Sequence, residues 1–122
     1  MKRELEYQLY EILNEVSRVE EATKSLDEAE FLRRRRELDT VVRRLHRISR
    51  CVRALPYEFV SVHTEVPWER IASLGGELDS SEVRLDPAAA WRAISEDLPI
   101  LKRQLLTVLD EVRYGARGEE EE

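Results

Sequence analysis

The side chains best suited to proton transfer or nucleophilic attack near neutral pH are few in this sequence: His46, Cys51 and His63. An imidazole titrates at about pH 6.5, so either histidine could act as a general acid or base. The spacing favours structural roles, because His46 flanks an apolar helical stripe and His63 has no recognisable partner. A nucleophilic thiol needs an orienting base, which Cys51 lacks in the sequence pattern. We therefore expect Cys51 to be a small, partly buried apolar residue.

Ligands for a metal ion or a nucleotide are equally scarce. Zinc sites need clustered cysteine and histidine, and the sequence has one cysteine and two histidines. The Gly75-Gly76 pair is not followed by the Lys-Ser or Lys-Thr of a phosphate-binding loop. We expect no metal and no cofactor. A lone cysteine suits a reducing compartment, and the sequence shows neither a signal-peptide pattern nor a membrane-spanning apolar run, so we expect a cytoplasmic protein without membrane contact.

Arginines form the strongest charge pattern. At about 100° per residue, most arginines between residues 33 and 53 project away from the apolar stripe that includes Leu38 and Leu45. The tightest cluster, which we call the arginine ridge, comprises Arg36, Arg43, Arg47 and Arg50. Such a ridge could bind RNA phosphates or an acidic surface of a partner protein. We favour the alternative, a solvated face paired with glutamates of the first helix, because the net charge is −6.

Apolar residues at intervals of three and four place these groups on helices. Residues 3–24 are expected to form a first amphipathic helix. Ser25 and Glu28 match a capping box, with Ser25 as the N-cap, that begins a second helix. This second helix is expected to continue to Leu55, because Pro56 discourages helical backbone at the residue before it.

The middle of the chain is less regular. Residues 56–66 suggest a short buried helix or turn, and a second short helix is expected to begin at Pro67. Gly75-Gly76 should end it, because glycine is the usual residue beyond a helix C-terminus. Residues 77–85 are expected to form a loop.

The last helix is expected to begin with Asp86 as N-cap and Pro87 at the first helical position. Pro99 lies inside it and predicts a kink, because proline cannot bond to the Ser95 carbonyl while the apolar period continues. Gly115 should end it. We expect residues 1–116 to form one all-α domain, an antiparallel up-and-down bundle of four to five helices, and residues 117–122 to form a disordered acidic tail.

Three blocks of the sequence resemble those of a known family. They are VPWERIA at residues 66–72, Asp86-Pro87 followed by Trp91, and DLPILKRQL at residues 97–105. The span 48–105 thereby resembles the HepT-like branch of the HEPN family, the ribonuclease-toxin components of toxin–antitoxin pairs. The resemblance implies a HEPN-like helical bundle that forms homodimers. It also implies a nucleotidyltransferase-type (MNT) antitoxin partner.

Between those blocks the family carries a hallmark of arginine, asparagine, histidine and tyrosine, and this sequence departs from it. In the register of the resemblance, these positions hold Gly75, Gly76, Ser80 and Glu82. RNA cleavage without a metal needs a proton acceptor for the 2′-hydroxyl and a cation for the charge on phosphorus. Gly75 supplies no charge, Ser80 is a poor base, and Glu82 would repel the phosphate. Glu82 also lacks the phenol that some partners adenylylate.

Three functional hypotheses follow. The first is a catalytically inactive HepT-like subunit, a dimer that interacts with a nucleotidyltransferase-type partner or with RNA. The second is an enzyme, a metal-independent ribonuclease that uses other residues, such as His63 with Arg70 or Arg84. The third is a structural helical protein whose hallmark has been lost without a new role. We favour the first, because a motif replaced at every key position is hard to rescue.

Overall fold

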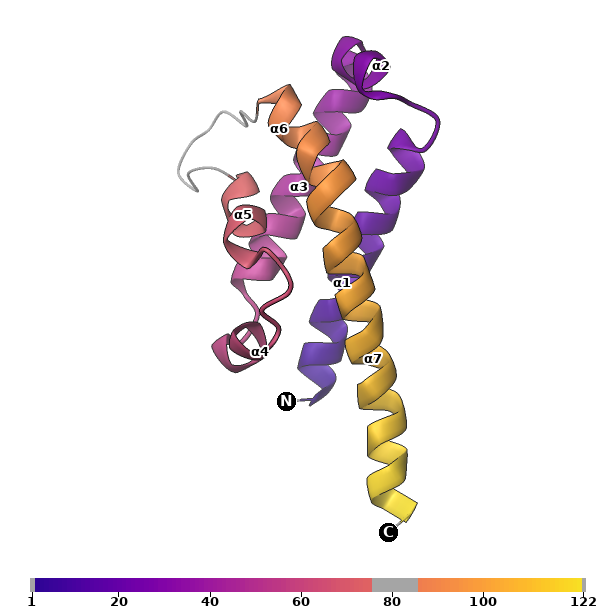
Figure 1. The fold of residues 1–122 in the computed structure, drawn as a ribbon, viewed down its shortest axis with the longest axis vertical. Helices are drawn as coiled ribbons and strands as arrows, with labels where there is room; N and C mark the ends of the chain where they lie inside the picture. The colour runs from indigo at the N-terminus through magenta and orange to yellow at the C-terminus, as the bar shows by residue number, and fades with distance from the viewer. Residues whose placement is uncertain (1, 76–85, 122) are drawn as a thin grey trace.

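The computed structural model describes residues 2–75 and 86–121, with the backbone alone for Lys2, Gly75 and residues 113–121. The described residues form helices and connecting turns, which confirms the all-α class (Figure 1). In order, the elements are α1 (Lys2–Thr23), α2 (Glu28–Arg33), α3 (Arg35–Arg53), α4 (Tyr57–Val62), α5 (Trp68–Ala72), the 3₁₀ turn η1 (Ser73–Gly75), α6 (Pro87–Arg92), the π-helical turn η2 (Ala93–Asp97) and α7 (Leu98–Glu121). None of the helices described is both long enough and apolar enough to cross a bilayer.

Three long helices carry the bundle, as the apolar period predicts. In Figure 1, α1 rises from the N-terminus, while α3 and α7 both descend beside it. The buried face of α1 includes Leu9, Ile12 and Val16, each at most 1% exposed, and α1 packs against both α3 and α7. Burial of one such side chain contributes about 1.5–3 kcal/mol, so this shared stripe makes a large contribution to stability. The antiparallel arrangement predicted for the bundle is thus present.

The second predicted helix is interrupted. Asp27, not Ser25, is the N-cap of α2: its carboxylate accepts from the Glu30 backbone N–H at 2.8 Å, and Glu30 Oε1 accepts from the Asp27 N–H at 3.3 Å. The Ser25 prediction was wrong because the sequence offers two overlapping capping boxes, two residues apart. The helix then breaks at Arg34, whose backbone lies outside the helical region. Phe31 of α2, which precedes the break, is fully buried in the core.

The short helices behave as the turn residues predict. Pro56 precedes α4, which buries Phe59, and so confirms a short helix in the irregular segment. Pro67 is the N-cap of α5, and the Trp68 indole N–H donates to the His63 carbonyl at 2.8 Å. That bond closes the connection between α4 and α5. The helical path then continues through η1 as far as Gly75.

The last helix continues past its proline. Asp86 accepts from the Ala88 N–H at 3.4 Å, which confirms it as the N-cap. Pro99 does not stop the helix, as predicted, whereas the kink itself stays a prediction. A π-helical turn, η2, ends two residues before the proline, and the Leu98 N–H bonds to the Ala93 carbonyl five residues back. The predicted end at Gly115 was wrong, because the backbone of α7 stays helical to Glu121. The domain limit at residue 116 and the disorder of residues 117–122 stay predictions.

Candidate functional site

The last turn of α5 is fixed onto the middle of α3. The Ser49 hydroxyl and the Arg53 Nε both donate to the Ala72 carbonyl, the latter at 2.9 Å. Ser49 is 1% exposed, so its hydroxyl would be costly to bury without a partner. The last carbonyl groups of a helix have no hydrogen-bond donor within that helix, and these two side chains supply donors to the Ala72 carbonyl at the end of α5. They also hold η1, and therefore Gly75, against α3.

A second link fixes α5 to the π-helical turn. Arg70 Nη2 lies 2.8 Å from Asp97 Oδ1, and the Asp97 side chain is only 5% exposed while that of Arg70 is 50% exposed. A buried carboxylate needs a cation or several donors to offset the loss of hydration. Arg70 supplies that cation, so its guanidinium is committed to structure. The segment of residues 76–85 therefore starts and ends on elements that are anchored to each other.

Three of the four hallmark positions fall within this segment, and the fourth, Gly75, directly precedes it. Gly75 is the last residue of η1, which packs against α3. Gly76, Ser80, Glu82 and the alternative candidate Arg84 lie outside the described residues. The expectations about these four positions therefore rest on residue type alone. The structure places the anchored residues before and after them, and glycine at position 75 can contribute neither charge nor a hydrogen-bonding side chain.

His63, the base considered in the enzyme hypothesis, is occupied by packing contacts. Its ring lies 4.4 Å from the Phe59 ring, centroid to centroid, and its Nδ1 lies 3.1 Å from Gln104 Nε2 of α7. Its carbonyl receives the Trp68 indole N–H. Within the described residues, no hydrogen bond or ion pair joins His63 to Arg70. The structural role expected for His63 agrees with these contacts, and the pair His63 with Arg70 is not assembled.

His46 is in a different situation. Its ring is partly buried beside the α3 core face, and its Nε2 is shielded from solvent without a hydrogen-bond partner in the described part of the chain. Burial lowers the pKa of His46 from its ordinary value, and the nearby guanidinium groups of Arg50 and Arg53 lower this pKa further. The imidazole is therefore neutral near pH 7. The sequence predicted the boundary position of His46 but not its unpaired nitrogen.

Cys51 is partly buried, as expected, and packs against the core. Burial raises the pKa of its thiol, and the carboxylates of Glu11 and Glu15 raise it further. The thiol form therefore dominates near neutral pH, and the nucleophilic thiolate is rare. Among the residues that the structure describes, no group of three histidine, cysteine or carboxylate side chains is placed to hold a metal ion.

The arginine ridge is only partly paired. Arg44 beside it bonds to Glu15 of α1 at 3.1 Å, and Arg47 of the ridge lies 3.7 Å from the same carboxylate with its own side chain 63% exposed. These contacts are the pairing with the first helix that the sequence indicated. The remaining ridge members are exposed and form no ion pair within the described residues: Arg36, Arg43 and Arg50. The ridge thus keeps unpaired guanidinium groups on the exposed side of α3.

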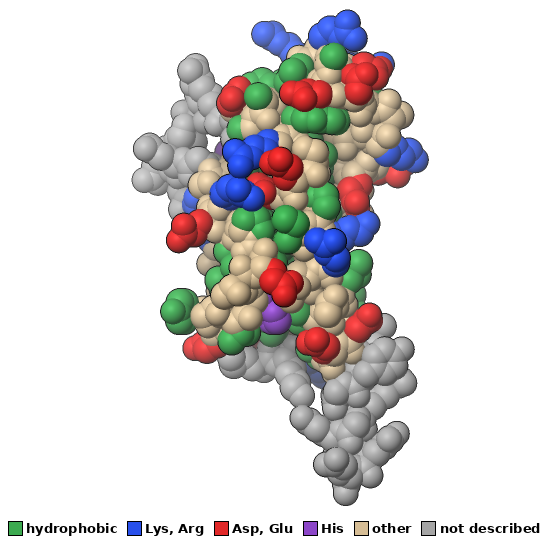
Figure 2. Space-filling model, in the orientation of Figure 1, with side chains coloured by type: hydrophobic (Ala, Val, Ile, Leu, Met, Phe, Trp, Pro, Cys, Tyr) green, Lys and Arg blue, Asp and Glu red, His purple; other side chains and the backbone are tan. Residues whose placement is uncertain are grey.

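Figure 2 shows the charges on one face of the molecule. Lys and Arg side chains lie there beside Asp and Glu side chains, in small groups of both signs rather than in one large patch. The Lys102–Glu20 pair at 3.0 Å, which links α7 to α1, is an example of such matched charges. A face of alternating charge is typical of a solvated protein surface.

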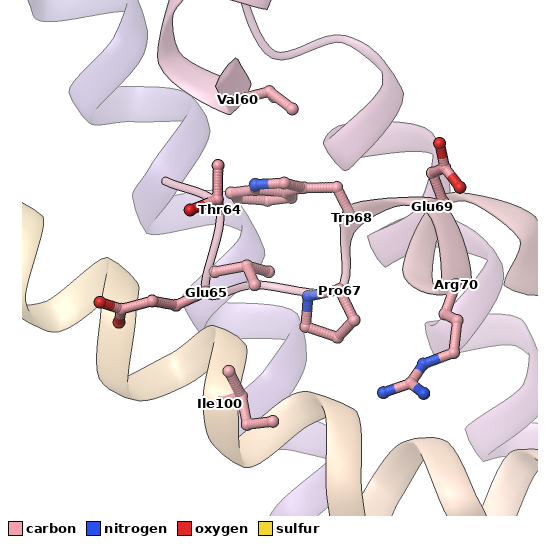
Figure 3. A pocket seen from close by; sticks show the side chains of 9 residues that line it. Val60, Thr64, Glu65, Pro67, Trp68, Glu69, Arg70 and Ile100 are labelled. Carbon is pink, nitrogen blue, oxygen red and sulfur yellow. The ribbon is translucent and has the colours of Figure 1, made fainter. Parts of the chain in front are cut away.

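A shallow groove of about 600 Å³ lies between the α4–α5 connection and α7 (Figure 3). Figure 3 shows Pro67 facing Ile100 across it, with the Glu65 carboxylate and the Arg70 guanidinium at its edges. The lining residues are Val60, Thr64, Glu65, Val66, Pro67, Trp68, Glu69, Arg70 and Ile100. No histidine or cysteine lines it, so the groove offers surface for packing but no group suited to proton transfer near neutral pH.

Comparison with known proteins places the chain in a family. The profile of the family described as Ribonuclease HepT-like matches residues 12–108, and the chain belongs to this family. A probable ribonuclease HepT of Thermococcus cleftensis is 28% identical over 84% of this chain and 93% of its own length. A putative RNase of Caldanaerobacter subterraneus subsp. tengcongensis is 29% identical over 83% of this chain and 90% of its own.

A third relative is a larger protein. The gamma-glutamylcyclotransferase and putative RNase of Methanocaldococcus jannaschii is 28% identical over 92% of this chain, which spans half of that relative's length. No solved structure matches the chain. The matches confirm the family resemblance carried by the three sequence blocks. Arg70 and Asp97, which form an ion pair, come from two of these blocks. The sequence alone did not reveal that they pair.

Proposed function

We propose that this chain is a HepT-like protein that has lost the standard catalytic groups and acts as a dimeric interaction subunit. Its partner would be a nucleotidyltransferase-type protein of the MNT antitoxin class, or RNA. The observation that carries the proposal is the set of residues at the hallmark positions, Gly75, Gly76, Ser80 and Glu82. None of them can supply the imidazole, guanidinium or phenol that the family resemblance leads one to expect there.

The intact scaffold supports this proposal. The Ala72 carbonyl is held from α3, and the Arg70–Asp97 pair joins α5 to η2. The elements before and after the hallmark positions are therefore held together, although the imidazole, guanidinium and phenol of the hallmark are absent. A fold that had lost every role would need no such fixed frame, whereas a binding subunit would keep its surface. Loss of a base and a cation typically removes orders of magnitude in rate.

RNA cleavage tests the loss of activity directly. Wild-type protein should leave labelled tRNA intact under conditions in which a restored variant, Gly75→Arg/Gly76→Asn/Ser80→His/Glu82→Tyr, cleaves it without added metal. A matched variant that restores only Glu82→Tyr should remain inactive, because it still lacks the cation and the base. Metal-independent cleavage by the wild type would instead favour a ribonuclease that uses other residues. Its loss in His63→Ala would assign that base.

Assembly is tested separately. Light scattering of the purified chain should give the mass of a dimer over a range of concentrations. A small nucleotidyltransferase encoded beside this chain should co-elute with it when the two are expressed together. A monomer at all concentrations would contradict the dimer, and separate elution of the two proteins would contradict the nucleotidyltransferase partner.

A further inference from the structure

The segment from α4 to α5 carries an apolar surface that no described element covers. The groove between this segment and α7 adjoins a second shallow groove of about 330 Å³, since Val60, Trp68 and Glu69 line both. Tyr57 of α4 lines the second groove and is 79% exposed, more than any other large apolar side chain among the described residues. Continuous exposed apolar surface of this kind marks a place where another molecule packs.

Carboxylates without cationic partners border the first groove. Glu65 and Glu69 line it, and Figure 3 shows them on either side of Trp68. Both are exposed, as is Glu58 on α4, and none of the three forms an ion pair within the described residues. This surface is therefore apolar along its centre and negative at its edges.

The cations near the first groove do not offset this charge. Arg70 lines the groove, but its guanidinium is paired with the buried carboxylate of Asp97. Arg53 lines only the second groove, where its Nε donates to a backbone carbonyl. Arg103 of α7 is exposed but lines neither groove. The first groove therefore keeps two carboxylates that a ligand can neutralise.

We propose that these two grooves, which we call the α4–α5 surface, bind a segment of a partner protein in which lysine or arginine flanks apolar side chains. The apolar side chains would cover Tyr57, Trp68 and Ile100, and the flanking cations would pair with Glu65 and Glu69. An amphipathic helix with basic flanks has this pattern, and such helices bind in apolar grooves.

Other classes of ligand match the α4–α5 surface less well. Its carboxylates repel the phosphates of a nucleic acid or of an anionic membrane. Pockets for small molecules enclose most of their ligand, whereas these grooves are shallow and would leave most of a small molecule in water. A protein segment can lie along both grooves and bury the apolar side chains between them.

This inference rests on the proposed function in one respect, that the chain acts through a protein partner. It adds the surface that recognises that partner and the chemistry of the segment recognised. Its failure is distinguishable from failure of the proposed function, because peptide binding depends neither on RNA cleavage nor on the mass of the chain in solution. RNA cleavage by the wild type would contradict the proposed function and would leave the peptide assay unchanged.

Fluorescence anisotropy with labelled synthetic peptides tests the α4–α5 surface. The probe is a helical peptide of about 18 residues, roughly 27 Å long, with leucine along one face and lysine beside it. One control peptide carries glutamate in place of lysine, and the other scatters the leucines so that no apolar face forms. The lysine peptide should bind about tenfold more tightly than either control, since it alone supplies both several ion pairs and an apolar face. Added salt should weaken its binding, because exposed ion pairs are screened.

A pair of charge variants locates the binding. Glu65→Gln/Glu69→Gln should weaken binding of the lysine peptide about fivefold, the loss expected for two exposed ion pairs. The control Glu11→Gln/Glu111→Gln removes the same charge from exposed positions of α1 and α7. It should change the affinity by less than about twofold, because only the long-range field of the protein changes.

A pair of apolar variants tests the centre of the surface. Tyr57→Ser should weaken binding about threefold, because it removes an aromatic side chain that the peptide would bury. The control Tyr7→Ser removes a tyrosine from α1 that is 65% exposed, and it should leave the affinity unchanged. Both tyrosines are exposed, so neither change should unfold the protein. Circular dichroism and thermal melting establish that every variant is folded.

Several results would overturn this inference. They are equal affinity for the three peptides, no binding of the lysine peptide, or equal losses in a surface variant and its control. Loss in the glutamate variant with none in Tyr57→Ser would reduce the interaction to general charge attraction and would also overturn it. Self-association abolished by Glu65→Gln/Glu69→Gln, without peptide binding, would reassign the surface to a second copy of the chain, whose arginine ridge would supply the cations.

Discussion

Removal of Arg70 should expose how much the α5–η2 link contributes to the fold. In Arg70→Met the methionine keeps an apolar stem of similar length but no charge. The Asp97 carboxylate, with its side chain 5% exposed, then loses the guanidinium at 2.8 Å. The folded state then bears the cost of a buried carboxylate that has lost its cation.

The magnitude follows from the exposure of the two partners. Orphaning one member of a fully buried ion pair costs about 3–5 kcal/mol. The Arg70 side chain is half exposed, so solvent already screens part of the attraction and can hydrate the orphaned carboxylate in part. We therefore expect Arg70→Met to lower the free energy of unfolding by about 2 kcal/mol, or the melting temperature by roughly 8 °C for a chain of this size.

Urea unfolding monitored by circular dichroism measures this, at one protein concentration because a dimer would make stability concentration-dependent. The double variant Arg70→Met/Asp97→Leu should return to within about 1 kcal/mol of wild type, since an apolar pair of similar volume often replaces a buried ion pair at little cost. The double-mutant cycle should then give a coupling of about 2 kcal/mol.

The Arg92–Glu96 pair is a matched control. Its two atoms are also close, at 2.9 Å, but both side chains are more than half exposed. Arg92→Met should therefore cost below about 0.5 kcal/mol. Arg70→Met could lower the free energy of unfolding no more than Arg92→Met does, or the cycle could show no coupling. Either result would mean that burial of Asp97 does not strengthen the contribution of the ion pair to stability, and it would refute the reasoning.

Three further predictions concern other residues. Asp27→Ala should destabilise the protein by about 1 kcal/mol in urea unfolding, because it removes the helix cap, whereas Ser25→Ala should be nearly neutral; the reverse order would restore Ser25 as the cap. The lowered pKa of His46 means that the unfolded chain takes up this proton first as the pH falls below 6.5, so stability should fall more steeply between about pH 7.5 and about pH 5.5 in the wild type than in His46→Gln; parallel curves would contradict it. The raised pKa of the Cys51 thiol should make its reaction with a thiol reagent near neutral pH slower in the folded protein than in urea, and equal rates would refute a protected thiol.

The helical period predicted most of the fold. Helices α1, α3 and α7 follow from apolar residues at intervals of three and four, because that spacing leaves one face to bury. The break at Arg34 was not visible in this pattern, since Phe31 and Leu38 are seven residues apart and keep the heptad spacing across it. Gly115 was a misleading signal, because a glycine inside a helix costs only about 1 kcal/mol and does not have to end it.

The site was predictable in residue type more than in geometry. The replaced hallmark is a property of the sequence, and so is the arginine ridge on α3. The link between Arg70 and Asp97 joins residues 27 positions apart, and only the packing of α5 on η2 brings them together. The unpaired nitrogen of His46 likewise depends on what surrounds the ring in three dimensions.

The wide turn η2 also sets the rotational phase of the last helix. Each residue of an α-helix advances the chain by about 100°, so deleting one residue from Ala93–Asp97 would turn α6 by that angle relative to α7. Trp91, whose ring centre lies 5.3 Å from that of Phe31, would then swing away from α2. The extra residue in this turn lets α6 contact α2 and α3 while α7, which continues from it, packs along α1. A more regular helix would be a worse fit to its neighbours.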